Sequence, residues 1–178
     1  MDATAATLRE VAVPASIFEI LHRELAKEAG ELPTIHALHA AGYAAGEEAS
    51  TIFRQALGGD PGGVGQASFW QRFAAFFDSR GWGTLAHDGS HDAVGFLVSG
   101  NWVEARGDES RNGCMFTSGF LAGFLTEIAG GPVAVLEVAC RRRGDPRCSF
   151  AFGSEAVVHD LYGDLLAGRD LDAALAGL

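Results

Sequence analysis

Apolar side chains recur with helical spacing through the first 80 residues of the chain. The pattern predicts a first helix over residues 14–30, where Pro14 suits the first turn and Gly30 caps the C-terminus. A second, longer helix is expected over residues 33–58, and its many small residues imply close packing against a neighbour. A third helix is expected over residues 68–79, with phenylalanines crowded on one side. The residues before Pro14 have no clear period and are expected to form a loose arm.

From residue 82 the apolar period changes from helical spacing to two, which is typical of half-buried strands. Asp88-Gly89 is a strong signal for a tight hairpin turn, here between strands over residues 82–87 and 93–98. A further strand is expected over residues 102–106. These segments predict an antiparallel sheet.

The segment 114–128 is apolar almost all round, which predicts a central buried helix. Gly119 and Gly123 lie one turn apart in it and indicate close helix packing. Two more strands and a closing amphipathic helix are expected over residues 133–140, 148–152 and 154–166. We therefore predict an α+β domain, with N-terminal helices packed on an antiparallel sheet of four to five strands.

Charge narrows the classes of partner. The chain has 23 acidic and 13 basic side chains, a formal net charge of −10. Phosphate recognition needs a basic patch, so a direct nucleic-acid partner is not expected. No segment reaches the roughly 18–20 apolar residues that span a bilayer, and the N-terminal residues lack a signal-peptide pattern. The expected location is the cytoplasm. The glycine-rich run 58–65 lacks the Lys-Ser/Thr of a phosphate-binding loop, and we interpret it as a connector.

Three cysteines are an odd number, which in a reducing compartment favours free thiols or a metal site over disulfides. Cys140 and Cys148 lie symmetrically about Gly144. A turn at Gly144 would bring the two sulfur atoms together across adjacent strands. Such a pair could be buried apolar thiols, a disulfide or part of a metal site.

Two further residues extend this pair to a candidate metal shell. Cys114 begins the predicted buried helix, and Glu137 lies in an apolar strand, where a carboxylate needs a partner. Together with Cys140 and Cys148 they could form a tetrahedral zinc shell. Residues i and i+3 of a regular strand face opposite sides, so Glu137 and Cys140 can share a metal only if the strand bulges or ends between them. Such a shell has a net charge of −2, which neighbouring arginines could offset: Arg141, Arg142, Arg143 and Arg147.

Several motifs between residues 43 and 152 resemble those of one known family. They are Gly-Tyr-x-x-Gly at 42–46, Gly-Trp-Gly at 81–83, Asn-Trp-Val-Glu-Ala at 101–105, Gly-Phe-Leu-Ala-Gly-Phe at 119–124 after Cys114, and Glu-x-x-Cys followed by Gly-Asp-Pro-x-Cys-x-Phe at 137–150. At these residues the chain resembles the 4-vinyl reductase domain family. That domain is also the sensor module of bacterial activators that detect phenols and other aromatic hydrocarbons.

The resemblance implies a bound zinc ion and a fold. As in the aromatic sensors, the zinc would be held by Cys114, Glu137, Cys140 and Cys148, and a closed shell of four protein ligands is structural and not catalytic. The fold would be shared with haem-nitric-oxide-binding domains and Golgi transport-complex subunits, and a homodimer is implied. We divide the chain into an arm and helix that is a candidate dimerisation element, a ligand-binding domain and a tail, over residues 1–30, 31–166 and 167–178.

Our expected function is a stand-alone sensor or binding domain for a small hydrophobic or aromatic ligand, with its signal passed to a partner chain. An apolar pocket is expected between sheet and helices, lined by Trp70, Phe73, Phe77, Phe96, Trp102, Phe116 and Phe120, with Glu104 as a candidate anchor for a ligand hydroxyl. The same aromatic side chains could instead fill a solid core.

Two alternatives from other classes stay open. One is an enzyme or assembly factor in tetrapyrrole (vinyl) reduction, although the sequence has no dinucleotide or flavin motif and no evident pair of general acid and base. The other is a dimeric scaffold that acts through protein–protein contact. We favour the non-enzymatic binding domain.

Overall fold

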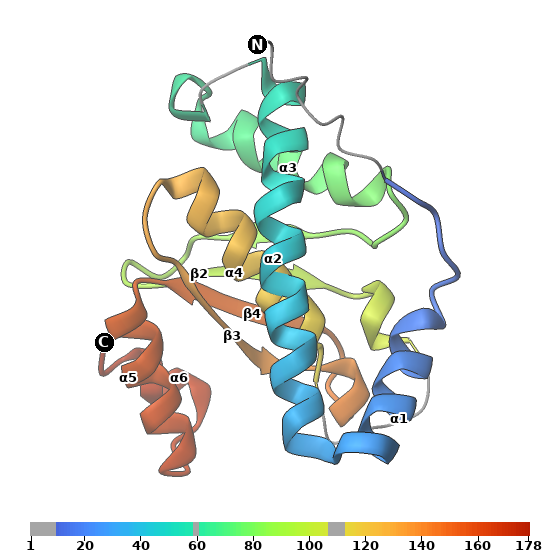
Figure 1. Ribbon diagram of the computed structural model, residues 1–178. Helices are drawn as coiled ribbons and strands as arrows, with labels where there is room; N and C mark the ends of the chain where they lie inside the picture. Colours follow the sequence, from blue (N-terminus) through green and yellow to red (C-terminus); the bar gives the residue numbers. More distant parts are fainter. Residues whose placement is uncertain (1–9, 59–60, 107–112) are drawn as a thin grey trace.

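A four-stranded antiparallel sheet separates two groups of helices (Figure 1). The computed structural model describes residues 10–58, 61–106 and 113–178. The strands lie in the order β1–β2–β4–β3, and their bounds are β1 Ala86–Asp88, β2 Gly95–Ser99, β3 Ala134–Ala139 and β4 Cys148–Gly153. The helices are α1 Ile17–Ala29, α2 Glu31–Leu57, α3 Gln66–Asp78, α4 Met115–Ala129, α5 Glu155–Leu166 and α6 Leu171–Leu175. The predicted α+β class, with N-terminal helices packed against an antiparallel sheet, is confirmed.

Strand register divides the apolar residues between the two faces of the sheet. Leu97 of β2 lies opposite Phe150 of β4, and both belong to the main core with α2, α3 and α4. The next pair along the strands, Phe96 and Ala151, belongs to a smaller core under α5 and α6. Alternate side chains of a strand point to opposite faces, so the sheet is buried on both sides.

The central helix α4 packs against α2 at backbone contact distance. A Cβ atom placed on Gly42 would lie 2.1 Å from the carbonyl oxygen of Phe116, and one on Gly119 would lie 2.0 Å from that of His39. Gly46 and Gly123 repeat this pair of contacts one turn along. Only glycine has no side chain to hold the helices apart, which explains the small residues that the sequence places on both helices.

The sheet is smaller than its sequence pattern indicates. The predicted tight turn at Asp88-Gly89 is wrong, because the first residues paired across the hairpin are Asp88 and Phe96 and a longer loop joins the strands. The Asp88 carboxylate accepts a hydrogen bond from the Ser90 N–H (3.0 Å), an alternative local turn. The predicted strand over 102–106 is also wrong: Val103–Ala105 forms a 3-10 turn.

The helix boundaries follow the capping signals closely. Gly30 has φ +87° and Gly58 has φ +85°, so both terminate helices in backbone conformations that favour glycine. The helix α2 begins two residues before the predicted Pro33. The short helix α6, whose Ala174 is fully buried, lies in the segment that we expected to be a tail. Most of the predicted N-terminal arm, residues 1–9, lies outside the described residues, as do residues 59–60 of the predicted connector.

No helix in the described part of the chain has the length and apolar character needed to cross a membrane.

The crossing of α2 and α4 leads to a stability prediction. Gly119→Ala should destabilise the fold by about 1–3 kcal/mol or more, because the added Cβ forces the two backbones apart. Gly163→Ala in α5 is the matched control: nothing lies within 4 Å of the added atom, and the exchange should stabilise by about 0.5–1 kcal/mol. Urea unfolding of both variants checks this, and equal stabilities would contradict the packing argument.

Candidate functional site

The three cysteines and Glu137 form one buried cluster, which we call the cysteine–glutamate cluster. One ligand atom from each of Cys114, Glu137, Cys140 and Cys148 lies within 4.8 Å of all the others. All three cysteines are fully buried, and the sulfur atoms of Cys114 and Cys140 are 3.8 Å apart. The predicted grouping of these four residues is therefore present, and the cluster could hold a metal ion.

Local backbone features bring the four ligands together. The pairing of β3 with β4 shifts register between Glu137 and Ala139, and β3 ends at Ala139. This bulge turns Glu137 and Cys140 toward one site, as the sequence argument required. The turn to β4 is closed at Gly144, which has φ +92°, and by Asp145, whose carboxylate accepts a hydrogen bond from the Cys140 N–H (2.7 Å).

Glu137 has one oxygen satisfied and one without a partner. Its Oε2 accepts a hydrogen bond from the Cys114 N–H (2.8 Å) and lies 3.6 Å from Nη1 of Arg143. Its Oε1 is buried and has no hydrogen-bond partner. A buried carboxylate oxygen without a partner is costly, and a cation in the cluster would satisfy it. This donor set of three sulfur atoms and one oxygen fits a tetrahedral zinc ion.

The protonation of the cluster reflects crowding of acidic groups. Burial, followed by the neighbouring Cys140, raises the pKa of Glu137 to about 8. Hydrogen bonds from Cys114 and Cys140 lower the pKa of Cys148 to about 4, and hydrogen bonds with Cys140 and Cys148 raise the pKa of Cys114. The buried side chains thus compete for a limited negative charge, and a divalent cation would relieve this competition.

The arginines beside the cluster have different environments. Arg143 reaches Glu137 through its side chain and also donates to the Glu137 carbonyl oxygen (3.4 Å). Arg142 is buried, whereas Arg141 and Arg147 are exposed. Within the described part of the chain, Arg143 is the arginine that forms an ion pair with the cluster, so direct charge compensation comes from one side chain.

Sequence reasoning missed Gly113, which allows Glu137 to reach the cluster. A Cβ atom on Gly113 would clash with Oε2 of Glu137. The position of a glycine directly before Cys114 is the signal that could have identified it, because close approach of a buried side chain requires a residue without one.

Glu104 caps the start of α4 instead of facing an open pocket. Its two oxygens accept hydrogen bonds from the backbone N–H groups of Phe116 (3.1 Å) and Thr117 (2.7 Å) and from the Thr117 hydroxyl. The indole N–H of Trp102 donates to the same hydroxyl (2.7 Å). Burial raises the pKa of Glu104 to about 7. The carboxylate thereby anchors the helix terminus beside Cys114.

The structure separates the aromatic residues that we predicted to line a pocket. Phe96 lies in the smaller core on the other face of the sheet. The others pack on the main core, where rings contact one another in edge and tilted geometries. Most of this set fills space rather than enclosing it, namely Trp70, Phe73, Trp102 and Phe116.

A smaller pocket of about 210 Å³ does lie at the edge of this core. Phe77 and Phe120 from the predicted set contribute to it, and Trp82 lies beside them, its ring centroid 4.7 Å from that of Phe120. The remaining walls come from α2, α3 and the segment before α1, through Ala45, Glu48, Ala49, Ile52, Phe76, Arg80, Glu10 and Val11. We call this the Trp82 pocket.

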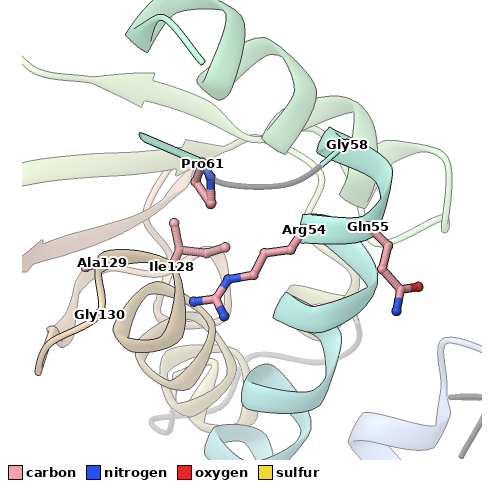
Figure 2. A pocket seen from close by; sticks show the side chains of 7 residues that line it. All are labelled: Arg54, Gln55, Gly58, Pro61, Ile128, Ala129 and Gly130. Atoms are coloured by element: carbon pink, nitrogen blue, oxygen red, sulfur yellow. The ribbon is translucent and has the colours of Figure 1, made fainter. Parts of the chain in front are cut away.

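A second hollow of about 700 Å³ has a different character (Figure 2). Arg54 projects from α2 toward Ile128 of α4, and the two glycines that end these helices, Gly58 and Gly130, form part of the wall. Helix C-termini carry partial negative charge, which the Arg54 guanidinium offsets. None of the predicted pocket residues lines this hollow.

Comparison with known proteins places these features in a family. The sequence profile of the 4-vinyl reductase domain matches residues 101–154, which hold Glu104 and the whole cysteine–glutamate cluster. No curated protein sequence matches the chain.

Three solved structures share the fold at 14–18% sequence identity. The phenol-responsive sensory domain of the transcription activator PoxR, solved with phenol, has a TM-score of 0.66 at 14% identity over 82% of this chain and 76% of its own. A trafficking protein particle complex subunit 3 from Naegleria fowleri, covalently bound to palmitic acid, has a TM-score of 0.62 at 15% identity over 78% and 91%. A vinyl-4-reductase family protein from Methanocaldococcus jannaschii has a TM-score of 0.54 at 18% identity over 81% and 83%.

The sequence motifs, the matched segment and the fold agree. The predicted resemblance is confirmed: the chain carries a domain of the 4-vinyl reductase family, within which the cysteine–glutamate cluster lies.

Proposed function

We propose that the chain is a zinc-containing sensor or binding domain for a small hydrophobic or aromatic ligand, and that the ligand enters the Trp82 pocket. The observation that carries the proposal is the aromatic lining of that pocket by Phe76, Phe77, Trp82 and Phe120. The likeness in fold to a sensory domain that was solved with phenol supports the same class of ligand.

The size and chemistry of the pocket favour a single-ring compound. An apolar cavity of about 150 Å³ in another protein is large enough to bind benzene, and the Trp82 pocket measures about 210 Å³. Ala45, Ala49 and Ile52 add an apolar wall on α2, opposite the aromatic side chains. A ligand of this size would bury most of its surface there. Because Glu104 does not line this pocket, a ligand hydroxyl would need another partner.

Zinc is the metal that the cysteine–glutamate cluster fits best. Thiolates favour soft or borderline metals, and four protein donors match a closed structural site. Its role would be to hold the β3–β4 hairpin to the start of α4. The unpartnered Oε1 of Glu137 supports this assignment independently of the thiols.

The zinc proposal predicts a specific loss on removing the carboxylate. Glu137→Gln should lower zinc affinity more than about tenfold, because the amide carries no charge to the metal. Glu127→Gln is the control, since Glu127 is a partly exposed glutamate outside the cluster. Native mass spectrometry and competition with a chelator measure the binding, and bound zinc should be lost as pH falls because protons compete for the ligands. Wild-type protein that takes up no stoichiometric zinc would contradict the assignment.

The ligand proposal predicts that filling the pocket abolishes binding. Ala49→Phe should remove saturable binding of phenol and benzyl alcohol, because the added ring occupies the space between α2 and Trp82. Ala44→Phe adds the same ring to an exposed position of α2 and should bind like wild type. Isothermal titration calorimetry measures both. If wild type bound no aromatic compound, or if Ala49→Phe bound as well as wild type, the proposed site would be wrong.

We also propose a homodimer formed through α1. Ile20, Leu21 and Leu25 of this helix and Leu32 just after it are exposed apolar side chains, and α1 contributes no buried residue. A contiguous apolar surface of this kind supports a protein–protein contact.

The dimer proposal predicts that a charge on α1 yields a monomer. Leu21→Glu should convert the dimer to a monomer in light scattering coupled to size exclusion, because the charge would be desolvated in the contact. Leu166→Glu introduces the same charge at an exposed apolar position on α5 and should leave the mass unchanged. A wild-type protein that is monomeric at all concentrations would overturn the proposal.

A further inference from the structure

Three charged side chains lie at the Trp82 pocket: Glu10, Glu48 and Arg80. Two of them are paired with each other. Nε and Nη2 of Arg80 donate to the two carboxylate oxygens of Glu10 at 2.6 and 3.0 Å. Nη1 of Arg80 donates to the Phe76 carbonyl oxygen (3.0 Å), and the guanidinium lies 3.6 Å from the centroid of the Phe76 ring. The positive charge at the pocket is therefore already neutralised and held by the protein.

Glu48 is the charge that this pairing leaves over. It is exposed on α2, and no ion pair or side-chain hydrogen bond involves it within the described residues. With Glu10 and Arg80 paired, the formal charge at the pocket is −1. The protein as a whole has a charge of −10, which adds to the same field.

The rest of the lining offers aromatic faces. Trp82 and Phe120 lie with ring centroids 4.7 Å apart, and Phe77 is 5.9 Å from Trp82. Aromatic faces attract cations as well as apolar groups, and tryptophan does so most strongly. An unpaired carboxylate beside aromatic faces is complementary to an organic cation.

From this arrangement we propose that the Trp82 pocket selects small aromatic amines in their protonated form. The ring would lie among Trp82, Phe77 and Phe120, and the ammonium group beside Glu48. This inference rests on the proposed function and adds the charge class of the ligand. A neutral phenol gains no ion pair with Glu48. A carboxylate is repelled by Glu48 and has to displace Glu10 from Arg80 before it finds a positive partner.

Three probes that share one ring test the charge preference: benzylamine, benzyl alcohol and benzoate. At pH 7 the amine is cationic, and calorimetry on the full chain should find it bound about fivefold more tightly than the alcohol. Benzoate should bind more weakly than both. Raising the salt concentration should reduce the preference for the amine, because the ion pair lies at an exposed rim.

Two neighbouring glutamates on α2 provide a matched pair of variants. Glu48→Gln should lower benzylamine affinity about fivefold, to that of benzyl alcohol, and leave benzyl alcohol unchanged. Glu47→Gln removes the same charge from an adjacent, exposed residue that does not line the pocket, and should retain the preference. Equal effects of the two substitutions would overturn the assignment to Glu48, because they would reflect only the overall field.

The remaining outcomes separate this inference from the proposed function. If benzylamine and benzyl alcohol bind equally to wild type and Ala49→Phe abolishes both, the pocket binds aromatic ligands and the amine preference is wrong. If benzoate binds most tightly, the inference is overturned and Arg80 is the anchor. If none of the three probes binds, the proposed function fails and this inference fails with it.

Discussion

Backbone contact between α2 and α4 is the constraint on which both candidate sites depend. Four glycines remove the side chains that would hold these helices apart, and carbonyl oxygens of each helix occupy the space. The crossing fixes the start of α4, where Cys114 joins the cysteine–glutamate cluster. It also fixes Phe120 opposite Ala45 and Ala49 of α2, in the wall of the Trp82 pocket. A shift of either helix would therefore disturb metal ligands and pocket together.

The cysteine–glutamate cluster performs a task that apolar packing cannot. Its hairpin joins two strands through a polar, arginine-rich turn, which offers little apolar surface to hold it against α4. Hydrogen bonds from Cys114 to Glu137 and from Cys140 to Asp145 set the geometry before any metal enters. The raised pKa of Glu137 shows what this arrangement costs while the negative charge is uncompensated. A preorganised but electrostatically unfavourable set of ligands is suited to tight metal binding.

The sequence predicted the cluster better than the pocket, for a physical reason. A metal shell depends on few residues whose spacing and strand geometry can be read directly, and the required bulge after Glu137 is present. A pocket is space that side chains fail to fill, and this depends on how every ring packs. Phe96 has the apolar ring expected of a pocket residue but faces the smaller core, because it alternates along β2 with Leu97, which faces the main core. Trp82, conversely, appeared only as the first residue of a strand that does not form there.

The connection from the pocket to the surface runs through α1 more readily than through α4. The helix α4 is held by the glycine contacts, by the Glu104 cap and by Cys114, so its displacement would break several interactions at once. The helix α1 has no buried residue and contacts the pocket wall through Phe18, whose ring centroid lies 6.0 Å from that of Trp82. A ligand that moves Trp82 therefore acts on a helix that can respond at little cost. Because the exposed apolar side chains lie on that same helix, ligand binding and contact with a second chain are expected to be energetically coupled, each changing the affinity for the other by the same factor.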